Sequence, residues 1–328
     1  MNRVHQQSGH PLFVYEVTPR CNNNCLYCYN VWKEPKGYPS GELSLNQIKV
    51  LFDKLLKEVT PESVMLTGGE PLLHKDIFEI VSFLKSRNIN LGLATNGALL
   101  DKENTDKLIT CGISYFEISL PSLKENVYQR LCQAGSVKKI REAILNVKRN
   151  KARLTVSFVI TKLNLPDLEE VIDLSFAFSA DFVALNRFVP GGRGLEHVRD
   201  LIVPQDGLRN ALDIANKRSA GLDFPVNIAV PVESCVIGHK TYPYLHFGTC
   251  TCAKKKWVID PLGNLRTCEQ NPEILGSLFS NSYLSLSESA SARQFCNNMS
   301  VDCKKCADSP YCGGGCKMLA SNYSHAVL

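Results

Sequence analysis

The stretch PLFVYEVTPRCNNNCLYCYN, residues 11–30, joins a short apolar run to three closely spaced cysteines. The run has the length and the β-branched and aromatic content of a buried strand. Cys21, Cys25 and Cys28 follow it at intervals of three and then two residues. Structural zinc sites take four ligands, commonly paired as C-x2-C, and no fourth cysteine or histidine lies close by. Either a distant residue completes a zinc or redox site, or the fourth position is left for a bound molecule.

Short apolar segments alternate with helix-like segments over the first two thirds of the chain. The clearest helix pattern spans residues 44–59, where Ser44 and Gln47 form a capping-box signature ahead of apolar residues at helical spacing. Strands that alternate with helices predict βα units and a parallel sheet. Six units are too few for a closed eight-stranded barrel, so we expect an α/β fold with a partial (β/α)6 TIM-like barrel. The expected strands lie at residues 12–18, 63–67, 89–95, 114–120, 154–161 and 181–188.

The composition is that of a globular protein without a strongly charged surface. The 328 residues include 37 basic and 32 acidic side chains, and the net charge of +5 is scattered, so we expect no nucleic-acid partner. No apolar run approaches the roughly 20 residues of a membrane-spanning helix, and residues 1–10 lack a signal-peptide core. We therefore expect no membrane partner and a cytoplasmic location, where 14 cysteines favour metal binding over disulfides. Cys111 and Cys132 stand apart and are interpreted as small buried hydrophobes.

The sequence changes character near Pro231, beyond which cysteines and glycines become frequent. We expect a domain boundary there. Residues 1–231 would form the barrel, and residues 232–328 would form a cysteine-rich domain that draws part of its folding energy from bound metal. A β-hairpin is expected over residues 257–267, WVIDPLGNLRT, with Pro-Leu-Gly-Asn at its turn.

Six cysteines of this region have a regular spacing. They suit either a pair of zinc ribbons or iron–sulfur clusters, because a cubic cluster needs four thiolates that converge from separate turns. The pattern is C-x10-G-x4-C at Cys252, Gly263 and Cys268, followed by C-x2-C-x5-C-x3-C at Cys303, Cys306, Cys312 and Cys316.

Both cysteine patterns resemble those of the radical S-adenosylmethionine (radical SAM) enzyme superfamily, in the subfamily with a C-terminal SPASM extension. The resemblance implies an enzyme in which Cys21, Cys25 and Cys28 bind a [4Fe–4S] cluster and leave one iron free to chelate S-adenosylmethionine. An electron from that cluster would cleave the sulfonium to a 5′-deoxyadenosyl radical, which abstracts hydrogen from a substrate. A reductase such as flavodoxin or ferredoxin would supply the electron.

The resemblance also implies a set of residues that bind S-adenosylmethionine. Tyr27 would lie near the adenine, and Gly68 and Gly69 would let the backbone approach the methionine amino group, with Glu70 as its anionic partner. The sequence departs from the family pattern at Pro121, where relatives often have Asp-Gly. The remaining implied positions are Asn96 of the TNG segment, Ser119 as a ribose- or carboxylate-binding residue, and Arg130 as a contact of the cofactor carboxylate.

For the C-terminal region the resemblance implies one or two auxiliary iron–sulfur clusters. Relatives close the second cluster with a downstream cysteine, and residues 317–328 contain none. We therefore expect Cys296, His325 or an open iron in that position. The first cluster would be held by Cys252, Cys268 and Cys316 with either Cys250 or Cys235, and the second by Cys303, Cys306 and Cys312.

Relatives with this layout mostly modify ribosomally made peptides or proteins, so peptide or protein modification is the expected function. The alternative is a small-molecule branch that removes propionate carboxylates from haem-type tetrapyrroles. Two hypotheses from other classes stay open, a zinc-ribbon adaptor and a ferredoxin-like electron carrier. Bound iron would exclude the adaptor, and reductive cleavage of S-adenosylmethionine would exclude the carrier.

Overall fold

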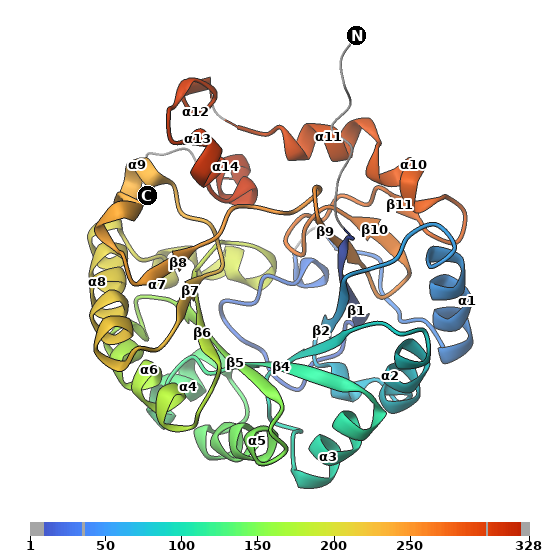
Figure 1. Ribbon diagram of the computed structural model, residues 1–328, viewed down its shortest axis with the longest axis horizontal. Helices are drawn as coiled ribbons and strands as arrows, with labels where there is room; N and C mark the ends of the chain where they lie inside the picture. The colour runs from blue at the N-terminus through green and yellow to red at the C-terminus, as the bar shows by residue number, and fades with distance from the viewer. Residues whose placement is uncertain (1–9, 35–36, 300, 323–328) are drawn as a thin grey trace.

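One eleven-stranded sheet runs through the computed structural model, which describes residues 10–34, 37–299 and 301–322. The strand order is β11-β10-β9-β1-β2-β3-β4-β5-β6-β7-β8, and every neighbouring pair from β9 through β1 to β8 is parallel. The sheet curves around a central space, and helices cover its outer side (Figure 1). The expected α/β partial barrel is confirmed.

The elements follow one another along the chain as alternating strands and helices up to β7, and then as shorter pieces. Among the described residues, no helix combines the length and the apolar character needed to span a membrane. The strands are β1 (Leu12–Thr18), β2 (Ser63–Gly68), β3 (Leu91–Thr95), β4 (Ile113–Ser119), β5 (Arg153–Ile160), β6 (Phe182–Arg187), β7 (Val226–Ile228), β8 (Leu245–Phe247), β9 (Lys256–Ile259), β10 (Asn264–Arg266) and β11 (Gly276–Ser277). The α-helices are α1 (Leu45–Leu55), α2 (Ile77–Ser86), α3 (Lys102–Cys111), α4 (Glu125–Cys132), α5 (Val137–Arg149), α6 (Leu168–Ala177), α7 (Val198–Leu201), α8 (Gln205–Leu222), α9 (Ser234–Ile237), α10 (Tyr283–Ser287), α11 (Ala290–Cys296), α12 (Val301–Lys305), α13 (Ser309–Cys312) and α14 (Lys317–Asn322). The 3-10 segments are η1 (Val31–Lys33), η2 (Pro71–Leu73), η3 (Leu165–Asp167), η4 (Gly192–His197) and η5 (His239–Thr241).

The six expected strands are present as β1 to β6, and the hairpin expected over residues 257–267 is present as β9 and β10. The sequence did not indicate β7 and β8. Each has only three residues, which is too short for a periodic apolar pattern to be recognised.

The expected capping box at the start of α1 is confirmed. The Ser44 amide donates to the side-chain oxygen of Gln47 (2.9 Å), and the Gln47 amide donates to the Ser44 hydroxyl (3.5 Å). The helix ends at Leu55 and turns its apolar face to the sheet, where the rings of Phe52 and Tyr15 pack edge to face at 5.3 Å. Apolar residues at helical spacing therefore form the barrel core as the sequence indicates.

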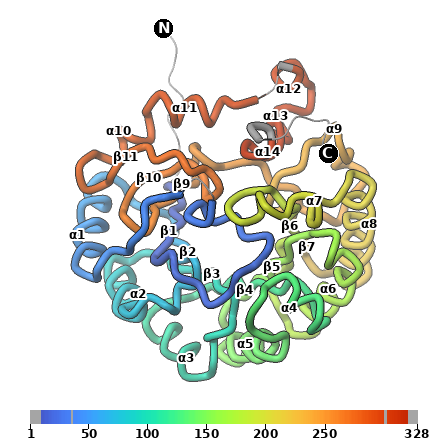
Figure 2. The backbone as a smooth tube through the Cα atoms, turned by 180° about the vertical axis from the view of Figure 1, so that it is seen from behind, coloured from blue at the N-terminus to red at the C-terminus, as the bar shows by residue number. Residues whose placement is uncertain are grey.

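The sheet continues across the boundary expected near Pro231. Strands β8 and β9 both come from residues beyond it, and β9 pairs in parallel with β1, with Leu12 opposite Lys256. The last helices, α10 to α14, lie along one side of the barrel in both views (Figures 1 and 2). The cysteine-rich region is thus joined to the first strand of the barrel through backbone hydrogen bonds.

A buried ion pair makes a second connection between these regions. Arg266 of β10 pairs with Glu16 of β1, and the two side chains are 0% and 1% exposed. The guanidinium of Arg266 also donates to the carbonyl oxygens of Glu269 (3.1 Å) and Asn271 (2.9 Å). Burial raises the pKa of Glu16 to about 7, although the neighbouring guanidinium opposes this rise. The pair fixes the segment after β10 relative to the start of the barrel.

Candidate metal and cofactor site

The three cysteines of the loop after β1 line a cavity of about 410 Å³ inside the barrel. Hydrogen bonds hold the backbone of this loop on both sides. The amide of Leu26 donates to the carbonyl of Leu131 in α4 (2.8 Å), and the amide of Gly194 in η4 donates to the carbonyl of Cys28 (3.0 Å). The loop therefore has a fixed path at the carboxyl end of β1, where parallel βα barrels place their chemistry.

Two glycine turns press against the cysteine loop so closely that a side chain would not fit. A Cβ atom at Gly69 would overlap the carbonyl oxygen of Arg20. One at Gly192, which has φ +51°, would fall 2.8 Å from the carbonyl oxygen of Cys28. Glycine is needed at both positions because only backbone can approach backbone at this distance.

Glu70 belongs to the TGGEP turn (residues 67–71), and its buried carboxylate faces the TNG segment (residues 95–97). It accepts hydrogen bonds from the Thr95 hydroxyl (2.8 and 2.9 Å) and from the Asn96 amide (2.9 Å). Burial raises the pKa of Glu70 to about 7 against the effect of these donors. Glu70 is not among the residues that line the cavity, whereas Asn96 is. Its carboxylate therefore positions the TNG segment, and the expected role as partner of an amino group stays a prediction.

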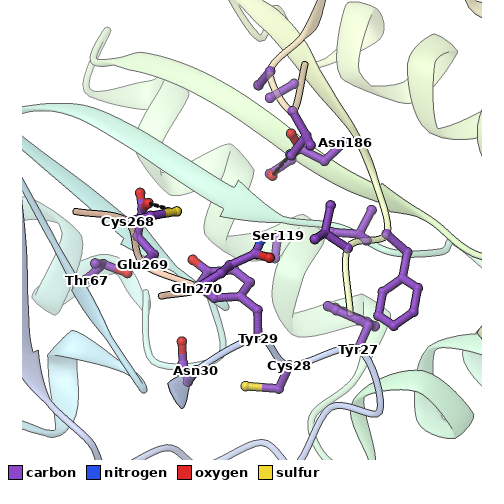
Figure 3. A pocket seen from close by; sticks show the side chains of 18 of the residues that line it. Tyr27, Cys28, Tyr29, Asn30, Thr67, Ser119, Asn186, Cys268, Glu269 and Gln270 are labelled. Atoms are coloured by element: carbon purple, nitrogen blue, oxygen red, sulfur yellow. Dashed lines mark hydrogen bonds between the residues drawn. The ribbon is translucent and has the colours of Figure 1, made fainter. Parts of the chain in front are cut away.

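The other residues expected to bind a cofactor divide into two groups. Tyr27, Gly68, Asn96 and Ser119 line the cavity, and the side-chain amide of Asn96 also donates to the side chain of Asn22 (2.7 Å). Figure 3 shows Tyr27 and Ser119 on the wall of this cavity.

Arg130 does not line the cavity and is exposed. Helix α4 turns Tyr128 and Leu131 inward, and helical spacing then places the intervening Arg130 on the outer side. The cofactor contact expected for Arg130 stays a prediction, and the position of its side chain does not support it.

Cys132 has surroundings that its sequence position did not reveal. It is buried, as expected, but it also lines the cavity, and its Sγ lies 3.6 Å from the hydroxyl of Tyr27. Hydrogen bonds from the Cys25 thiol and from Tyr27 lower the pKa of Cys132. The bond that Cys25 donates to Cys132, together with burial, raises the pKa of Cys25. Helix α4 places the Cys132 sulfur beside the cysteine loop. The sequence gives no sign of this, because Cys132 is far from the loop along the chain.

A second group of cysteines lines the same cavity from the opposite region of the chain. The ligand atoms of Cys252, Cys268 and Glu269 all lie within 4.8 Å of one another. A hydrogen bond from the Cys252 thiol lowers the pKa of Cys250 to about 6, and burial raises the pKa of Cys316 to about 11. The cysteines of this group are Cys250, Cys252, Cys268 and Cys316.

Residues 15–175 match the family model described as the radical SAM superfamily. This range contains the cysteine loop and the strands that carry the TGGEP and TNG turns. The chain therefore has a radical SAM domain over residues 15–175. It is therefore an enzyme of the class that binds a [4Fe–4S] cluster and S-adenosylmethionine.

Two relatives of this chain have names that give different activities, a synthase and a cyclase. The chain is 27% identical over 239 residues to the Fe-coproporphyrin III synthase of Methanosarcina barkeri, covering 72% of this chain and 58% of the relative. It is 29% identical over 195 residues to a probable GTP 3′,8-cyclase of Methanococcus maripaludis, covering 58% of this chain and 64% of the relative. The chain thus spans about three fifths of the length of these relatives.

Two solved structures share the fold of the radical SAM chain almost end to end. Streptococcus suis SuiB bound to S-adenosylmethionine gives a TM-score of 0.74 at 16% identity, covering 98% of this chain and 77% of SuiB. The structure of anSMEcpe with bound AdoMet gives a TM-score of 0.75 at 18% identity, covering 97% and 89%. At these identities the likeness concerns the fold.

The residues around the cavity fit the cluster and cofactor that radical SAM proteins bind. The loop offers three thiols to one cavity, and thiolates are the ligands that iron–sulfur clusters take. Burial raises the pKa of Cys28, so its thiol stays neutral unless a positive metal centre stabilises the thiolate. Gly68 and Gly69 line the adjacent wall with bare backbone, which suits a closely held ligand.

Several polar side chains of the radical SAM cavity were not found from the sequence. Lys256 of β9 pairs with Glu269 (2.9 and 3.0 Å), and Glu117 of β4 faces the same cavity with a pKa raised by burial. In Figure 3, Tyr29 points from the cysteine loop towards Gln270. An acidic residue inside the apolar run of β4 was the one signal available for Glu117.

The remaining cysteines of the radical SAM chain lie outside this cavity. Cys303 is partly exposed, Cys306 is exposed and Cys312 is buried, on and between α12 and α13. Cys296 is partly buried at the end of α11, and Cys235 is exposed on α9. His325 lies outside the described residues. Of the two residues expected to complete the first auxiliary site, only Cys250 reaches the cavity.

Proposed function

We propose that this protein is a radical SAM enzyme of the SPASM type that modifies a peptide or protein substrate. The observation that supports it most directly is the convergence of two cysteine groups, one from the loop after β1 and one from residues 250–316, on a single cavity. A substrate in that cavity would lie between them.

Each group has a defined task in this proposal. Cys21, Cys25 and Cys28 would hold the cluster that binds S-adenosylmethionine, with Tyr27 and Asn96 beside the cofactor. When bound, the cluster and cofactor would supply one-electron cleavage and a 5′-deoxyadenosyl radical that takes a hydrogen atom from the substrate.

The opposite wall would hold the first auxiliary cluster on Cys250, Cys252, Cys268 and Cys316. The side chains of Tyr29, Glu269 and Gln270 line the cavity between the two cysteine groups and would contact the substrate. An external reductase such as flavodoxin or ferredoxin would be the electron donor.

Charged residues of both signs line the cavity: Lys33, Arg187, Lys256 and Lys317 are basic, and Glu117 and Glu269 are acidic. Two of the lining cations already have acidic partners: Lys256 pairs with Glu269, and Arg187 makes two bonds of 2.9 and 3.0 Å to Glu233. Glu117 adds another carboxyl to the lining. The related fold of SuiB binds the precursor peptide SuiA, so this architecture can accommodate a peptide.

The second candidate is oxidative decarboxylation of a haem-type tetrapyrrole. It is favoured by the likeness to Fe-coproporphyrin III synthase, which extends over 72% of this chain. The two candidates share the cofactor chemistry and differ in the substrate that triggers it.

The test begins with anaerobic reconstitution and reduction of the full chain. We expect the visible absorption of iron–sulfur clusters and formation of 5′-deoxyadenosine from S-adenosylmethionine, measured by liquid chromatography and mass spectrometry. A colourless protein that binds zinc would contradict the proposal. If Fe-coproporphyrin III stimulates 5′-deoxyadenosine formation with release of carbon dioxide, the tetrapyrrole candidate replaces the peptide candidate.

A further inference from the structure

Three cysteines outside the cavity are held together by two short helices and the turn between them. Helix α12 carries Cys303, the amide of Cys306 donates to the carbonyl of Cys303 (3.3 Å), and α13 ends at Cys312. The Gly314 amide donates to the Sγ of Cys312 (3.4 Å). Three thiols are thus presented by one compact segment, as on the loop after β1.

Helix α9 carries an exposed cysteine on a firmly held backbone. The residue before the helix, Glu233, is 5% exposed and forms the two bonds to Arg187. The side chains of Gln205 and Arg209 both donate to the carbonyl of Val236 (2.8 and 2.9 Å). The position of Cys235 is therefore fixed by its neighbours on both sides, while its own side chain is exposed.

The two segments meet at the glycines that follow Cys312. A Cβ atom at Gly315 would overlap the carboxylate of Glu233, and one at Gly314 would lie 3.7 Å from the Cβ of Cys303. Cys235 lies two residues after Glu233, so this contact brings the start of α9 to the turn that follows Cys312. In both views α9 lies beside α13 and α14 (Figures 1 and 2).

We propose that Cys235 is the fourth ligand of a second iron–sulfur site, together with Cys303, Cys306 and Cys312. The proposal rests on the proposed function for the kind of metal centre. Its geometry comes from the contact of Glu233 with the glycine turn, which brings α9 against the segment that carries the other three thiols. A cubic cluster takes four thiolates that converge from separate turns. The segment of α12 and α13 supplies three of them, and α9 would supply the fourth.

Cys296 is the competing ligand and supplies the matched control. It lies at the end of α11 and is partly buried against the core. Cys235 lies on α9 and Cys296 on α11, so each can be replaced without changing the helix that carries the other. The two variants therefore distinguish the two possible ligands.

The first experiment is cysteine labelling of the iron-loaded full chain with iodoacetamide, without oxygen, and mass spectrometry of each cysteine peptide. We expect Cys235 and Cys306, both exposed in the structure, to react slowly in the loaded protein and rapidly after iron is removed with a chelator. Cys111 of α3, which does not line the cavity, should react alike in both samples. Labelling of Cys235 at the same rate with and without iron would overturn the proposal.

The second experiment compares the iron content of Cys235→Ala, Cys235→Ser and Cys296→Ala with the unchanged chain. We expect Cys235→Ala to lose the iron of one cluster, about four atoms per chain, and Cys296→Ala to lose none. Because the side chain of Cys235 is exposed, its replacement by Ala or Ser should leave the fold intact. Loss of iron in Cys296→Ala but not in the Cys235 variants would assign the site to Cys296 instead.

Formation of 5′-deoxyadenosine by the unchanged chain is measured in parallel and tests the proposed function separately. An unchanged chain that holds iron but does not cleave S-adenosylmethionine would reject the proposed function. The iron content of the Cys235 variants would still decide the ligand.

Discussion

The two cysteine groups that line the cavity are built in opposite ways. The first comes from one loop, residues 21–28, whose spacing places three thiols together without help from distant residues. The second is collected from positions between 250 and 316, before β9, after β10 and before α14. Both depend on β1, because the first loop follows that strand and β9 pairs beside it. The first group can be recognised from the sequence pattern of one loop, and we call it the local site. The second group comes together only when the strands pair, and we call it the collected site.

The largest expected effect is that of Cys25→Ala on the local site. Loss of one of three thiolates should remove the cluster, so that 5′-deoxyadenosine formation falls to the rate without enzyme. The product is measured by liquid chromatography and mass spectrometry. Cys111→Ala, outside the cavity, is the control and should keep the rate of the unchanged chain. Persistent cleavage in Cys25→Ala would refute the assignment of the loop.

Replacement of a cysteine in the collected site should separate S-adenosylmethionine cleavage from product formation. In Cys268→Ala we expect S-adenosylmethionine cleavage to continue without product formation, because the first loop is untouched. The ratio of modified substrate to 5′-deoxyadenosine is the quantity to follow. Normal turnover in this variant would mean that the second cysteine group is dispensable.

The connection between the two groups should depend on the buried pair of Arg266 and Glu16. Arg266→Met leaves a buried carboxylate without its partner, and we expect a loss of about 3–5 kcal/mol in the free energy of unfolding. Urea unfolding of the metal-free, reduced protein measures it. The double variant Arg266→Met with Glu16→Leu should recover most of this loss, because neither charge remains buried. A single variant as stable as the unchanged chain would show that backbone pairing of β9 with β1 is sufficient.

The smallest expected effect is a pH dependence that originates at Glu70. Burial raises its pKa from the ordinary value of 4.5 to about 7, so the folded state holds the proton more tightly than the unfolded state. The corresponding stability is fully present below about pH 4.5 and is lost as pH rises through about 7.

Glu70→Gln removes this titration. The stability advantage of the unchanged chain over the variant should shrink by about 1–3 kcal/mol between pH 5 and pH 8, measured by urea unfolding at both values. Glu16 titrates in the same range in both proteins, so the comparison isolates Glu70. An advantage that grows with pH would show that the hydrogen bonds from Thr95 and Asn96 outweigh burial.

Most of the barrel could be predicted because its signals are local. The capping box of Ser44 and Gln47, the six strands and the hairpin of β9 and β10 each depend on residues near one another in sequence. The cysteine loop is also a local signal. The covalent backbone limits the distance between thiols that are separated by only three or four residues in the sequence.

Side-chain direction at the site could be predicted only in part. Ser119 lies at the end of β4 and faces the cavity as expected, whereas Arg130 lies on the outer side of α4. Glu70 turns towards Thr95 because β2 and β3 are neighbours, which no pattern within TGGEP indicates.

Residue patterns alone were enough to predict the family, the first six strands, the hairpin of β9 and β10, and three thiols at the end of the first strand. The fold had to form before Cys250 could reach the cavity, Glu233 beside α9 could meet the turn after Cys312, and Cys132 could lie beside Tyr27. The physical reason is the range of the forces involved. Local spacing is set by the covalent chain and by short-range hydrogen bonds, whereas the meeting of distant thiols depends on which strands pair and in which register.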